Sequence, residues 1–424
     1  MLNKFIHKNY FQLNNILIPM NKKLLNIENN QIYNINNSIN EKLFYKECFP
    51  QTFEYLNSMK KFPYLTLSIK DYNIIKNKIE RLHKIFIETT KKILLINNVK
   101  NIYKKFNFSK NEWEFIKQNF NSNNNYLYGR MDLGFSFDLK QIKLFEYNTG
   151  LCGDIYDTTD FQNNIFNHYV DDNLLKNNSF HSGFNLINDL GKRFEFLIKN
   201  KKNKTIYIIC TNNKEENLVL NSLLQSMKNK NIKYKICRFF EGIKVDNNGN
   251  LIDSENKEKI DLIFKTYSWY KIFENYNKNK NSFFKYFINN YNNVEYIEPS
   301  WKTIMGNKAL LPYVYKYNKY NKNLIPSSFN PNDKIFEKDE YIIEKGIKGR
   351  GSKLTKKVKK TDIKNNKKEN VIYQKIFDKN FKKNYYYIMG AYIIGNKFSG
   401  FFVKQSNKII NDYNCNVIPV RILH

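Results

Sequence analysis

The sequence predicts a mixed α/β fold in which a β-hairpin and a group of C-terminal strands flank a small parallel α/β unit. Three observations support this prediction. Residues 126–148 contain two alternating apolar and polar segments joined by a short polar turn, which is typical of a hairpin. Residues 205–300 alternate short apolar runs with helical periodicity, and residues 341–403 add further short apolar runs. At 424 residues, the chain suits two or three subdomains around a cleft better than one simple core.

Four regions of the chain differ in composition and patterning. They are a variable, Asn-rich N-terminal segment, a helical region that contains the hairpin, the small α/β unit, and a C-terminal region of strands. Their expected bounds are residues 1–45, 46–200, 201–300 and 301–424. We find no internal repeat.

Helices are expected where apolar residues recur at spacings of three and four. This pattern covers residues 68–96, 155–200 and 215–228, and a shorter helix is expected to run from residue 302 to residue 311. The strands of the small α/β unit are expected at 205–210, 233–238, 262–266 and 295–297. Those of the C-terminal region are expected at 341–344, 371–377, 385–394 and 398–403. Residues 348–368 are rich in Lys and Gly and are expected to be a mobile loop.

The formal net charge of +31 is typical of a nucleic-acid-binding protein, but the composition favours another explanation. The chain has 64 Lys, only 6 Arg and 70 Asn, and Ile, Tyr and Phe are abundant too, as expected of an AT-rich coding sequence. A drift of this kind scatters charge over the surface, whereas a binding site gathers it. We therefore predict no specific nucleic-acid partner, although the positive field will attract anions.

The cysteines and histidines show no metal-ligand spacing, and the cysteines show no pairing pattern. This usage favours a reducing compartment. No apolar run is long enough to cross a membrane. The first acidic residue is Glu28, so the basic N-terminus is compatible with an organellar address, but we expect a cytoplasmic protein.

The hairpin carries the first candidate site. Residues two apart in a strand share a face, so Arg130 lies beside Asp132 on one strand, and Glu146 lies beside Asn148 on the other. If the turn holds an odd number of residues, Asp132 pairs with Glu146 and Arg130 pairs with Asn148. The opposite face is then apolar, with Met131, Leu133, Phe135 and Phe137 against Phe145 and Tyr147. Two close carboxylates repel unless a cation lies between them, which favours Mg²⁺, although an exposed polar face would show the same pattern.

Three further segments are weaker signals when each is taken alone. Residues 344–352 interleave three glycines with Lys345, Lys348 and Arg350, which suits phosphate binding but equally suits a solvated basic loop. Residues 298–312 read as a turn and the start of a helix, and residues 371–377 read as a strand.

Taken in order, these four segments resemble the glutathionylspermidine synthase family of ATP-grasp ligases. The resemblance extends from about residue 45 to the end and includes residues 260–269, 395–404 and 412–422. It implies an ATP-grasp fold with a small parallel pre-ATP-grasp-like α/β subdomain. It also implies an ATP-dependent carboxylate–amine ligase that forms an amide through an acyl phosphate and releases ADP and phosphate.

The resemblance also implies roles for individual residues. Asp132, Glu146 and Asn148 match ligands of Mg²⁺, of which two ions are expected. Arg130, Arg350 and Lys404 match catalytic residues, and Lys404 stands where the family often has arginine. The expected ATP-binding residues are Arg130, Asp132, Lys308, Lys345, Arg350, Ser352, Tyr373 and Gln374, and residues 345–368 form the lid over the phosphates. The implied partners are a small-molecule or peptide carboxylate and an amine such as a polyamine.

Two departures from the family pattern lie on the substrate side. Residues 149–154 read Thr-Gly-Leu-Cys-Gly-Asp, where the family has an acid and small hydroxyl residues, and Tyr270 replaces a frequent glutamate. The altered segment 149–154 and Lys404 leave a nucleotide-binding pseudoenzyme as an alternative, and the net charge leaves a basic nucleic-acid-binding protein as a more remote one. The oligomeric state is not encoded in any of these patterns.

Overall fold

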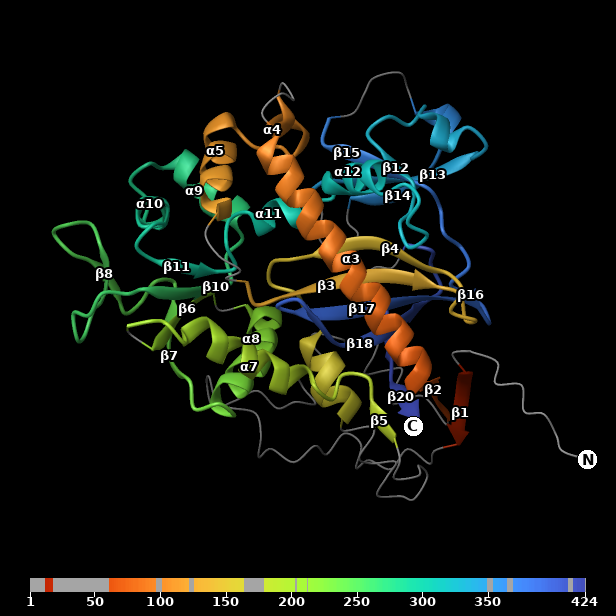
Figure 1. Cartoon of the computed structure of the whole chain (residues 1–424), viewed down its shortest axis with the longest axis horizontal. Helices are drawn as coiled ribbons and strands as arrows, with labels where there is room; N and C mark the ends of the chain where they lie inside the picture. Colours follow the sequence, from red (N-terminus) through yellow and green to blue (C-terminus); the bar gives the residue numbers. More distant parts are fainter. Residues whose placement is uncertain are drawn as a thin grey trace, which may run out of the picture.

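The structure is a computed structural model, and it is built around one antiparallel sheet with smaller sheets on either side (Figure 1). It describes residues 12–17, 61–96, 101–121, 126–163, 179–202, 204–211, 213–348, 354–363, 369–410 and 415–423.

The largest sheet has six antiparallel strands, in the order β19-β18-β17-β3-β4, with β16 beside β17. The hairpin predicted within residues 126–148 is confirmed, and it joins the C-terminal strands in this one sheet. The strands are β3 (Tyr128–Phe135), β4 (Ile142–Asn148), β16 (Phe381–Lys382), β17 (Tyr385–Ile394), β18 (Lys397–Ser406) and β19 (Asn416–Ile418).

The hairpin register agrees with the prediction for the polar pairs but not for the whole apolar face. Arg130 pairs with Asn148 and Asp132 pairs with Glu146. The connection between the last paired residues, Phe135 and Ile142, has an even number of residues, so the condition on which the expected pairing rested is not met. A bulge after Asp132 compensates, because it shifts the register by one residue. The bulge also turns Phe145 away from the apolar face, where Leu144 takes the place that was expected for it.

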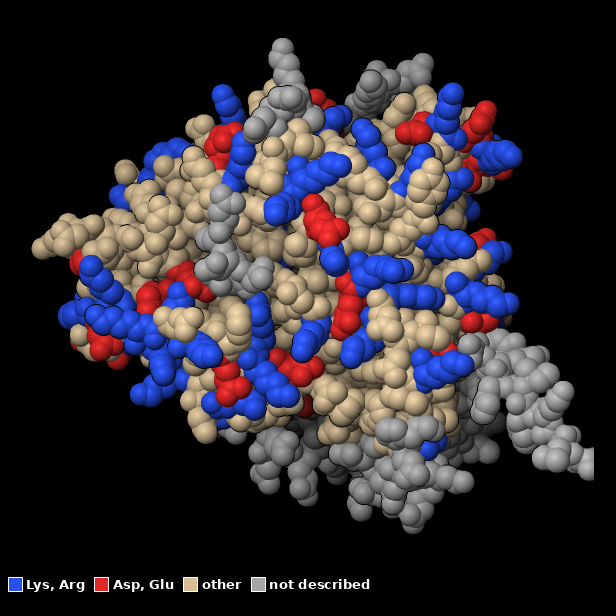
Figure 2. All heavy atoms as spheres, in the orientation of Figure 1, with Lys and Arg blue, Asp and Glu red and all other residues tan. Residues whose placement is uncertain are grey.

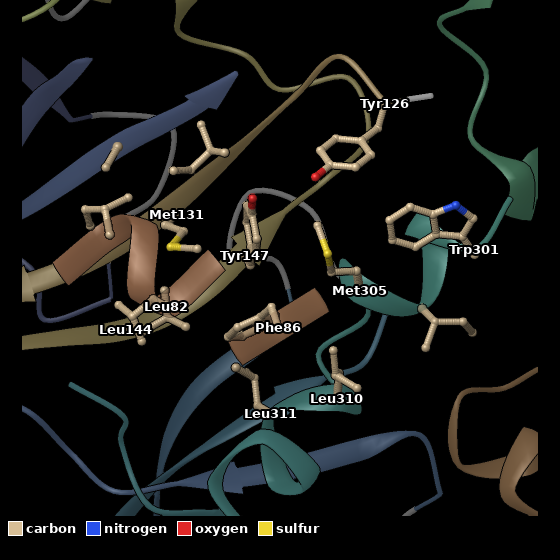
Figure 3. Close-up of a cluster of buried hydrophobic side chains, with 14 of the residues drawn as sticks. Leu82, Phe86, Tyr126, Met131, Leu144, Tyr147, Trp301, Met305, Leu310 and Leu311 are labelled. Atoms are coloured by element: carbon tan, nitrogen blue, oxygen red, sulfur yellow. The ribbon is translucent and has the colours of Figure 1, made fainter. Parts of the chain in front are cut away.

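The apolar face of the hairpin is covered by the long helix α3 (Ile69–Leu95). Phe86 of this helix packs edge-on against Tyr147, with ring centroids 5.3 Å apart. Figure 3 shows the same cluster extending to Met131 and Leu144 on the hairpin. Since this helix and its core occupy one face of the sheet, the polar side chains of β3 and β4 are left on the other.

The small parallel sheet has the order β11-β10-β6-β7. Three of its strands have the predicted bounds, and the fourth ends one residue earlier than expected. They are β6 (Thr205–Cys210), β7 (Lys233–Arg238), β10 (Leu262–Lys265) and β11 (Glu295–Ile297). Helices α7 (Leu186–Ile198) and α8 (Lys214–Lys228) share a core with this sheet.

A third sheet, with the antiparallel order β12-β15-β13-β14, contains the segment expected to form the lid. Residues 355–359, which we expected to be a mobile loop, form a strand paired with β13, so that expectation is wrong for them. The strands are β12 (Ser327–Ser328), β13 (Tyr341–Gly346), β14 (Thr355–Lys359) and β15 (Val371–Gln374).

A fourth sheet joins distant parts of the chain in the order β1-β2-β20-β5. Its strands are β1 (Gln12–Leu17), β2 (Lys61–Ser68), β5 (Ser179–His181) and β20 (Val420–Leu423). The strand β5 lies inside residues 155–200, where we expected helix throughout, because it pairs with β20 from the other end of the chain. The π-helical turn η3 (Asp157–Phe161) precedes it.

The remaining elements are short. They are β8 (Ile243–Val245), β9 (Leu251–Asp253), α4 (Ile102–Lys105), α5 (Lys110–Gln118), η2 (Asn119–Asn121), α9 (Trp269–Lys278), α10 (Phe284–Asn289), α11 (Lys302–Met305), α12 (Leu310–Tyr317), η4 (Lys334–Phe336) and η5 (Lys360–Asp362). Within the described part of the chain, no helix has the length and apolar character needed to cross a membrane. On the face shown in Figure 2, Lys and Arg are interleaved with Asp and Glu, as expected of a composition drift.

Candidate active site

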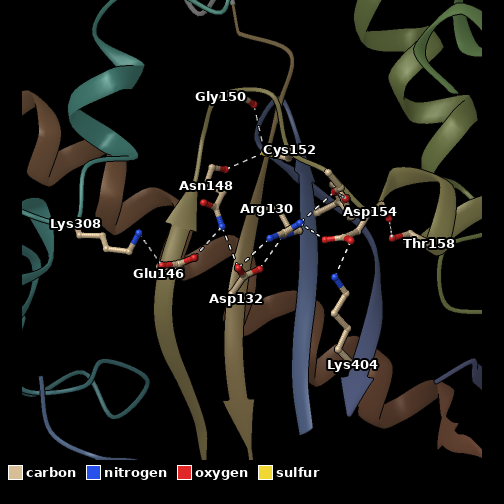
Figure 4. A network of polar contacts seen from close by, with 12 residues as sticks. Arg130, Asp132, Glu146, Asn148, Gly150, Cys152, Asp154, Thr158, Lys308 and Lys404 are labelled. Atoms are coloured by element: carbon tan, nitrogen blue, oxygen red, sulfur yellow. Dashed lines mark hydrogen bonds and ion pairs between the residues drawn. The ribbon is translucent and has the colours of Figure 1, made fainter. Parts of the chain in front are cut away.

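The polar face of the hairpin gathers a set of charged side chains from several strands (Figure 4). Arg130 and Asp132 form a bidentate ion pair, with Nε to Oδ1 at 2.7 Å and Nη2 to Oδ2 at 3.0 Å. Their side chains are only about one-sixth exposed. Burial is the main cause that raises the pKa of Asp132, and the Arg130 charge opposes it. The pair is therefore a fixed part of the site, held in place by its two hydrogen bonds.

Asn148 links the two carboxylates of the hairpin. Its amide nitrogen donates to Asp132 Oδ2 at 2.9 Å and to Glu146 Oε1 at 3.4 Å. The predicted trio of Asp132, Glu146 and Asn148 is thus brought together, and the amide group holds the carboxylates apart. A rotation of the amide by half a turn would present its oxygen in the same place.

Two lysines approach Glu146 from outside the hairpin. Lys308 Nζ lies 3.0 Å from Glu146 Oε2. Lys345, from β13, donates to the carbonyl oxygen of Phe145 at 3.0 Å. Burial alone would raise the pKa of Glu146, but Lys308 and Lys345 outweigh it and hold that pKa at about 2. Burial lowers the pKa of Lys345 to about 8, against the attraction of Glu146.

Asp154 is a site residue to which the sequence analysis gave no role. Its Oδ2 contacts Arg130 Nη1, and its Oδ1 accepts from Lys404 Nζ at 2.7 Å. The loop that carries it begins directly after β4, so a carboxylate six residues beyond Asn148 was a signal that could have been followed. Lys404 lies on β18, and the structure brings it into the same group of side chains as Arg130.

The ring of Phe402 lies beneath the two cations. Its centroid is 5.6 Å from the guanidinium carbon of Arg130 and 5.4 Å from Lys404 Nζ. Asp157 follows Asp154 by three residues in the chain, and its side chain is buried. Burial and the neighbouring Asp154 charge raise the pKa of Asp157 to about 7.

The expected adenine-side residues lie on the sheet of β13 and β15. Gln374 is buried and donates to Ser327 Oγ at 3.2 Å. Tyr373 packs instead in a separate small core with Phe336 and Ile342, on the face opposite to Lys345. Arg350 and Ser352 lie outside the described residues, so their expected roles stay predictions.

Tyr270, one of the departures from the family pattern, is part of an aromatic stack. Its ring lies parallel to Phe108, with centroids 4.6 Å apart, and Lys348 Nζ is 4.4 Å from its centroid. Its hydroxyl contacts the amide nitrogen of Asn307, the residue next to Lys308. Tyr270 therefore supports the segment that carries a candidate phosphate-binding lysine.

A buried ion pair connects the parallel sheet to the hairpin. Glu298 follows β11, and its Oε2 contacts Lys302 Nζ. Glu298 Oε1 accepts the backbone N–H groups of Leu127 and Tyr128, both at 3.1 Å, and Lys302 donates to the Tyr128 carbonyl at 2.6 Å. These bonds fix the start of β3 two residues before Arg130.

The donor set at the hairpin is chemically suited to a hard divalent cation. No group of three or more His, Cys, Asp and Glu side chains that could hold a metal occurs among the described residues. The trio on β3 and β4 has two carboxylates and one amide, which are oxygen ligands of the kind that Mg²⁺ prefers. The amide nitrogen of Asn148 now lies between the carboxylates, where positive charge is favoured.

Comparison with known proteins identifies the family to which the chain belongs. Residues 42–423 match the family described as "Glutathionylspermidine synthase preATP-grasp". The chain belongs to the glutathionylspermidine synthase family. The resemblance noted from the ordered motifs is thereby confirmed, since the match covers most of the chain.

The curated relatives share little sequence identity with this chain. A trypanothione synthetase from Crithidia fasciculata is 21% identical over 362 residues, which cover 81% of this chain and 54% of the relative. A bifunctional glutathionylspermidine synthetase/amidase from Escherichia coli (strain K12) is 24% identical over 285 residues, which cover 63% of this chain and 44% of the relative. The chain therefore spans about half the length of the curated relatives it matches.

The fold is similar to folds found among solved structures. A glutathione synthetase-like effector from Globodera pallida superposes with a TM-score of 0.52 at 10% identity, and the match covers 90% of this chain and 98% of the other. The mixed α/β prediction is confirmed in this coarser form, as a fold similar to that of a glutathione synthetase-like protein.

Proposed function

We propose that the protein is an ATP-dependent carboxylate–amine ligase with an ATP-grasp arrangement of its sheets. The observation that carries this proposal is the alternation of four cations with three carboxylates on one face of the central sheet. Arg130, Lys308, Lys345 and Lys404 are the cations, and Asp132, Glu146 and Asp154 are the carboxylates. Such a face can hold a polyphosphate and the negative charge that develops during transfer of its terminal group.

The nucleotide would lie between the central sheet and the sheet of β13 and β15. Lys345 of β13 already contacts the central sheet, because its ammonium donates to the Phe145 carbonyl of β4. In this arrangement Lys308 and Lys345 hold the phosphates, Gln374 lies toward the adenine, and Arg350 and Ser352 in the lid cover the phosphate groups.

Asp132, Glu146 and Asn148 would hold Mg²⁺, with Asn148 turned to present its oxygen. Bound there, the metal supplies positive charge to phosphate oxygens. The bidentate contact from Arg130 fixes the orientation of Asp132 whether or not the metal is bound.

A carboxylate is a poor electrophile, so the reaction needs a better leaving group. The substrate carboxylate attacks the γ-phosphorus of ATP, and the bond to the β–γ bridging oxygen breaks to give an acyl phosphate and ADP. The amine then attacks the acyl carbon, the carbon–oxygen bond to phosphate breaks, and the amide forms with loss of a proton. Arg130 stabilises the oxyanion, and Lys404 contacts the phosphoryl group.

The names of the relatives guide the choice of substrates. Trypanothione synthetase and glutathionylspermidine synthase imply a glutathione-type peptide as the carboxylate and spermidine as the amine. Because residues 149–154 and Tyr270 depart from the family pattern, we extend the candidate carboxylates to other small peptides and amino acids.

The decisive experiment is ADP release measured with Mg-ATP against a panel of peptides, amino acids and polyamines. Release that requires both a carboxylate and an amine supports the ligase. Tight Mg-ATP binding by calorimetry, with no release for any pair, would favour the pseudoenzyme alternative. A salt-dependent gel shift with a defined site size would favour nucleic-acid binding instead.

A further inference from the structure

The carboxylate of Asp154 binds two cations that come from different strands. Its Oδ1 accepts from Lys404 Nζ of β18 at 2.7 Å, and its Oδ2 contacts Arg130 Nη1 of β3. The side chain of Asp154 is 12% exposed, so water screens these contacts little. Figure 4 shows Asp154 between the two cations, on the side of Arg130 away from Asp132.

The guanidinium of Arg130 is almost fully engaged by protein oxygens. Of its five N–H groups, two donate to Asp132, one donates to the Gly153 carbonyl at 3.1 Å, and one contacts Asp154. An anion that is to be bound by Arg130 in the proposed reaction therefore has to replace a present partner. Asp132 takes two hydrogen bonds from Arg130 and Asp154 takes one, so replacing Asp154 costs Arg130 fewer bonds.

The backbone and the side chain of Asp154 are held by different contacts. Residues 149–154 join β4 to η3 without belonging to the sheet. The Asp154 carbonyl accepts from Thr158 N at 3.1 Å and from Thr158 Oγ1 at 2.7 Å, whereas its carboxylate contacts Arg130 and Lys404. Loss of the carboxylate contacts therefore leaves these backbone bonds in place.

Resting on the function proposed above, we infer that Asp154 is a built-in occupant of the anion site, which an incoming phosphate or carboxylate group displaces from Arg130 and Lys404. The carboxylate of Asp154 is negatively charged like the ligand. Because it is covalently attached to the chain next to both cations, its effective concentration at the site is high. It thus lowers the affinity of the site for simple anions and favours ligands that have further contacts.

Thermal unfolding in a series of inorganic phosphate concentrations tests this inference without any turnover. Ionic strength is held constant with chloride, and full-length wild type is compared with Asp154→Asn, which keeps the size of the side chain but removes its charge. If the carboxylate occupies the site for at least nine-tenths of the time, the variant should bind phosphate about tenfold more tightly or better. Its Tm should then rise more steeply with phosphate than that of the wild type.

Two further variants make the result specific. Asp160→Asn removes an acid of the neighbouring π-helical turn η3, whose carboxylate contacts the Thr159 hydroxyl, and its phosphate response should equal that of wild type. Adding Lys404→Gln to Asp154→Asn should abolish the gain. A response of Asp154→Asn no larger than that of wild type, including failure to fold at every phosphate concentration, would show that Asp154 is an irreplaceable part of the site. Because ADP release is measured separately, a protein without ligase activity could still show the phosphate effect.

Discussion

Arg130 and Asp132 lie two residues apart on β3, and their side chains meet in a bidentate pair of hydrogen bonds, at 2.7 and 3.0 Å. The pairing follows from strand geometry, because alternate residues share a face. It leaves the second side of the guanidinium directed at Asp154. A planar fork is needed to contact both carboxylates at once, which explains an arginine here in a chain with only six.

We predict that Arg130→Lys reduces ADP formation about 100-fold or more, because an ammonium keeps the charge but not the fork that holds Asp132 and stabilises the oxyanion. ADP release is the measurement, and thermal unfolding checks that the variant is folded. Arg193→Lys is the matched control, since Arg193 donates to the Tyr126 carbonyl, away from the polar face. Equal turnover in Arg130→Lys and wild type would remove Arg130 from the mechanism.

The pH dependence of the reaction with ATP should follow the charge of Lys345. Burial lowers its pKa to about 8, so Lys345 is charged below that pH and loses its charge as the pH rises through it. We therefore expect kcat/KM for ATP to fall above pH 8, because this ratio reports groups of the free enzyme. Arginine stays charged throughout this range, so Lys345→Arg should flatten the alkaline limb of the profile. An identical alkaline limb in both proteins would show that another group titrates there.

The buried pair of Glu298 and Lys302 should matter for stability more than for chemistry. Glu298→Gln leaves the ammonium of Lys302 buried without its counter-charge, at a cost of about 3–5 kcal/mol. We expect urea unfolding to show this loss, and we expect the double change Glu298→Gln with Lys302→Met to recover part of it. Glu274→Gln, in an exposed pair with Lys278, should produce little measurable change. A double variant no more stable than Glu298→Gln would contradict the explanation by unpaired charge.

Gly390 lets the ring of Phe402 lie close to the backbone of β17. A Cβ at this position would be 2.2 Å from Phe402 Cζ, so Gly390→Ala must shift the ring on which Arg130 and Lys404 rest. We expect the free energy of unfolding to fall by about 1–3 kcal/mol and ADP release to fall with it. Gly150→Ala, where the added methyl meets nothing, should lose no stability. Unchanged stability and activity in Gly390→Ala would mean that the ring has room to move.

Local patterns in the sequence were sufficient to predict many of the helices and strands. The parallel strands at 205–210, 233–238 and 295–297 have their predicted bounds. At 205–210 the reason is a continuous apolar run, which is typical of a buried strand in a parallel sheet. The opposition of Asp132 to Glu146 was also predicted from alternation alone. The strand β5 was missed because its partner β20 lies more than 200 residues further along the chain.

The family, the mixed α/β character and the side chains that share the polar face of the hairpin could all be predicted from the residues alone, because they depend on composition, order and the two-residue period of a strand. The folded structure was needed to show that Phe145 leaves the apolar face, that Tyr373 lies on the face opposite to Lys345, and that Asp154 reaches both Arg130 and Lys404. Those outcomes depend on a bulge, on the packing of separate sheets and on a loop returning to the sheet. The bulge is a local irregularity of the hairpin, and the other two are contacts between segments that are separated in the chain; the alternation of residues specifies none of them.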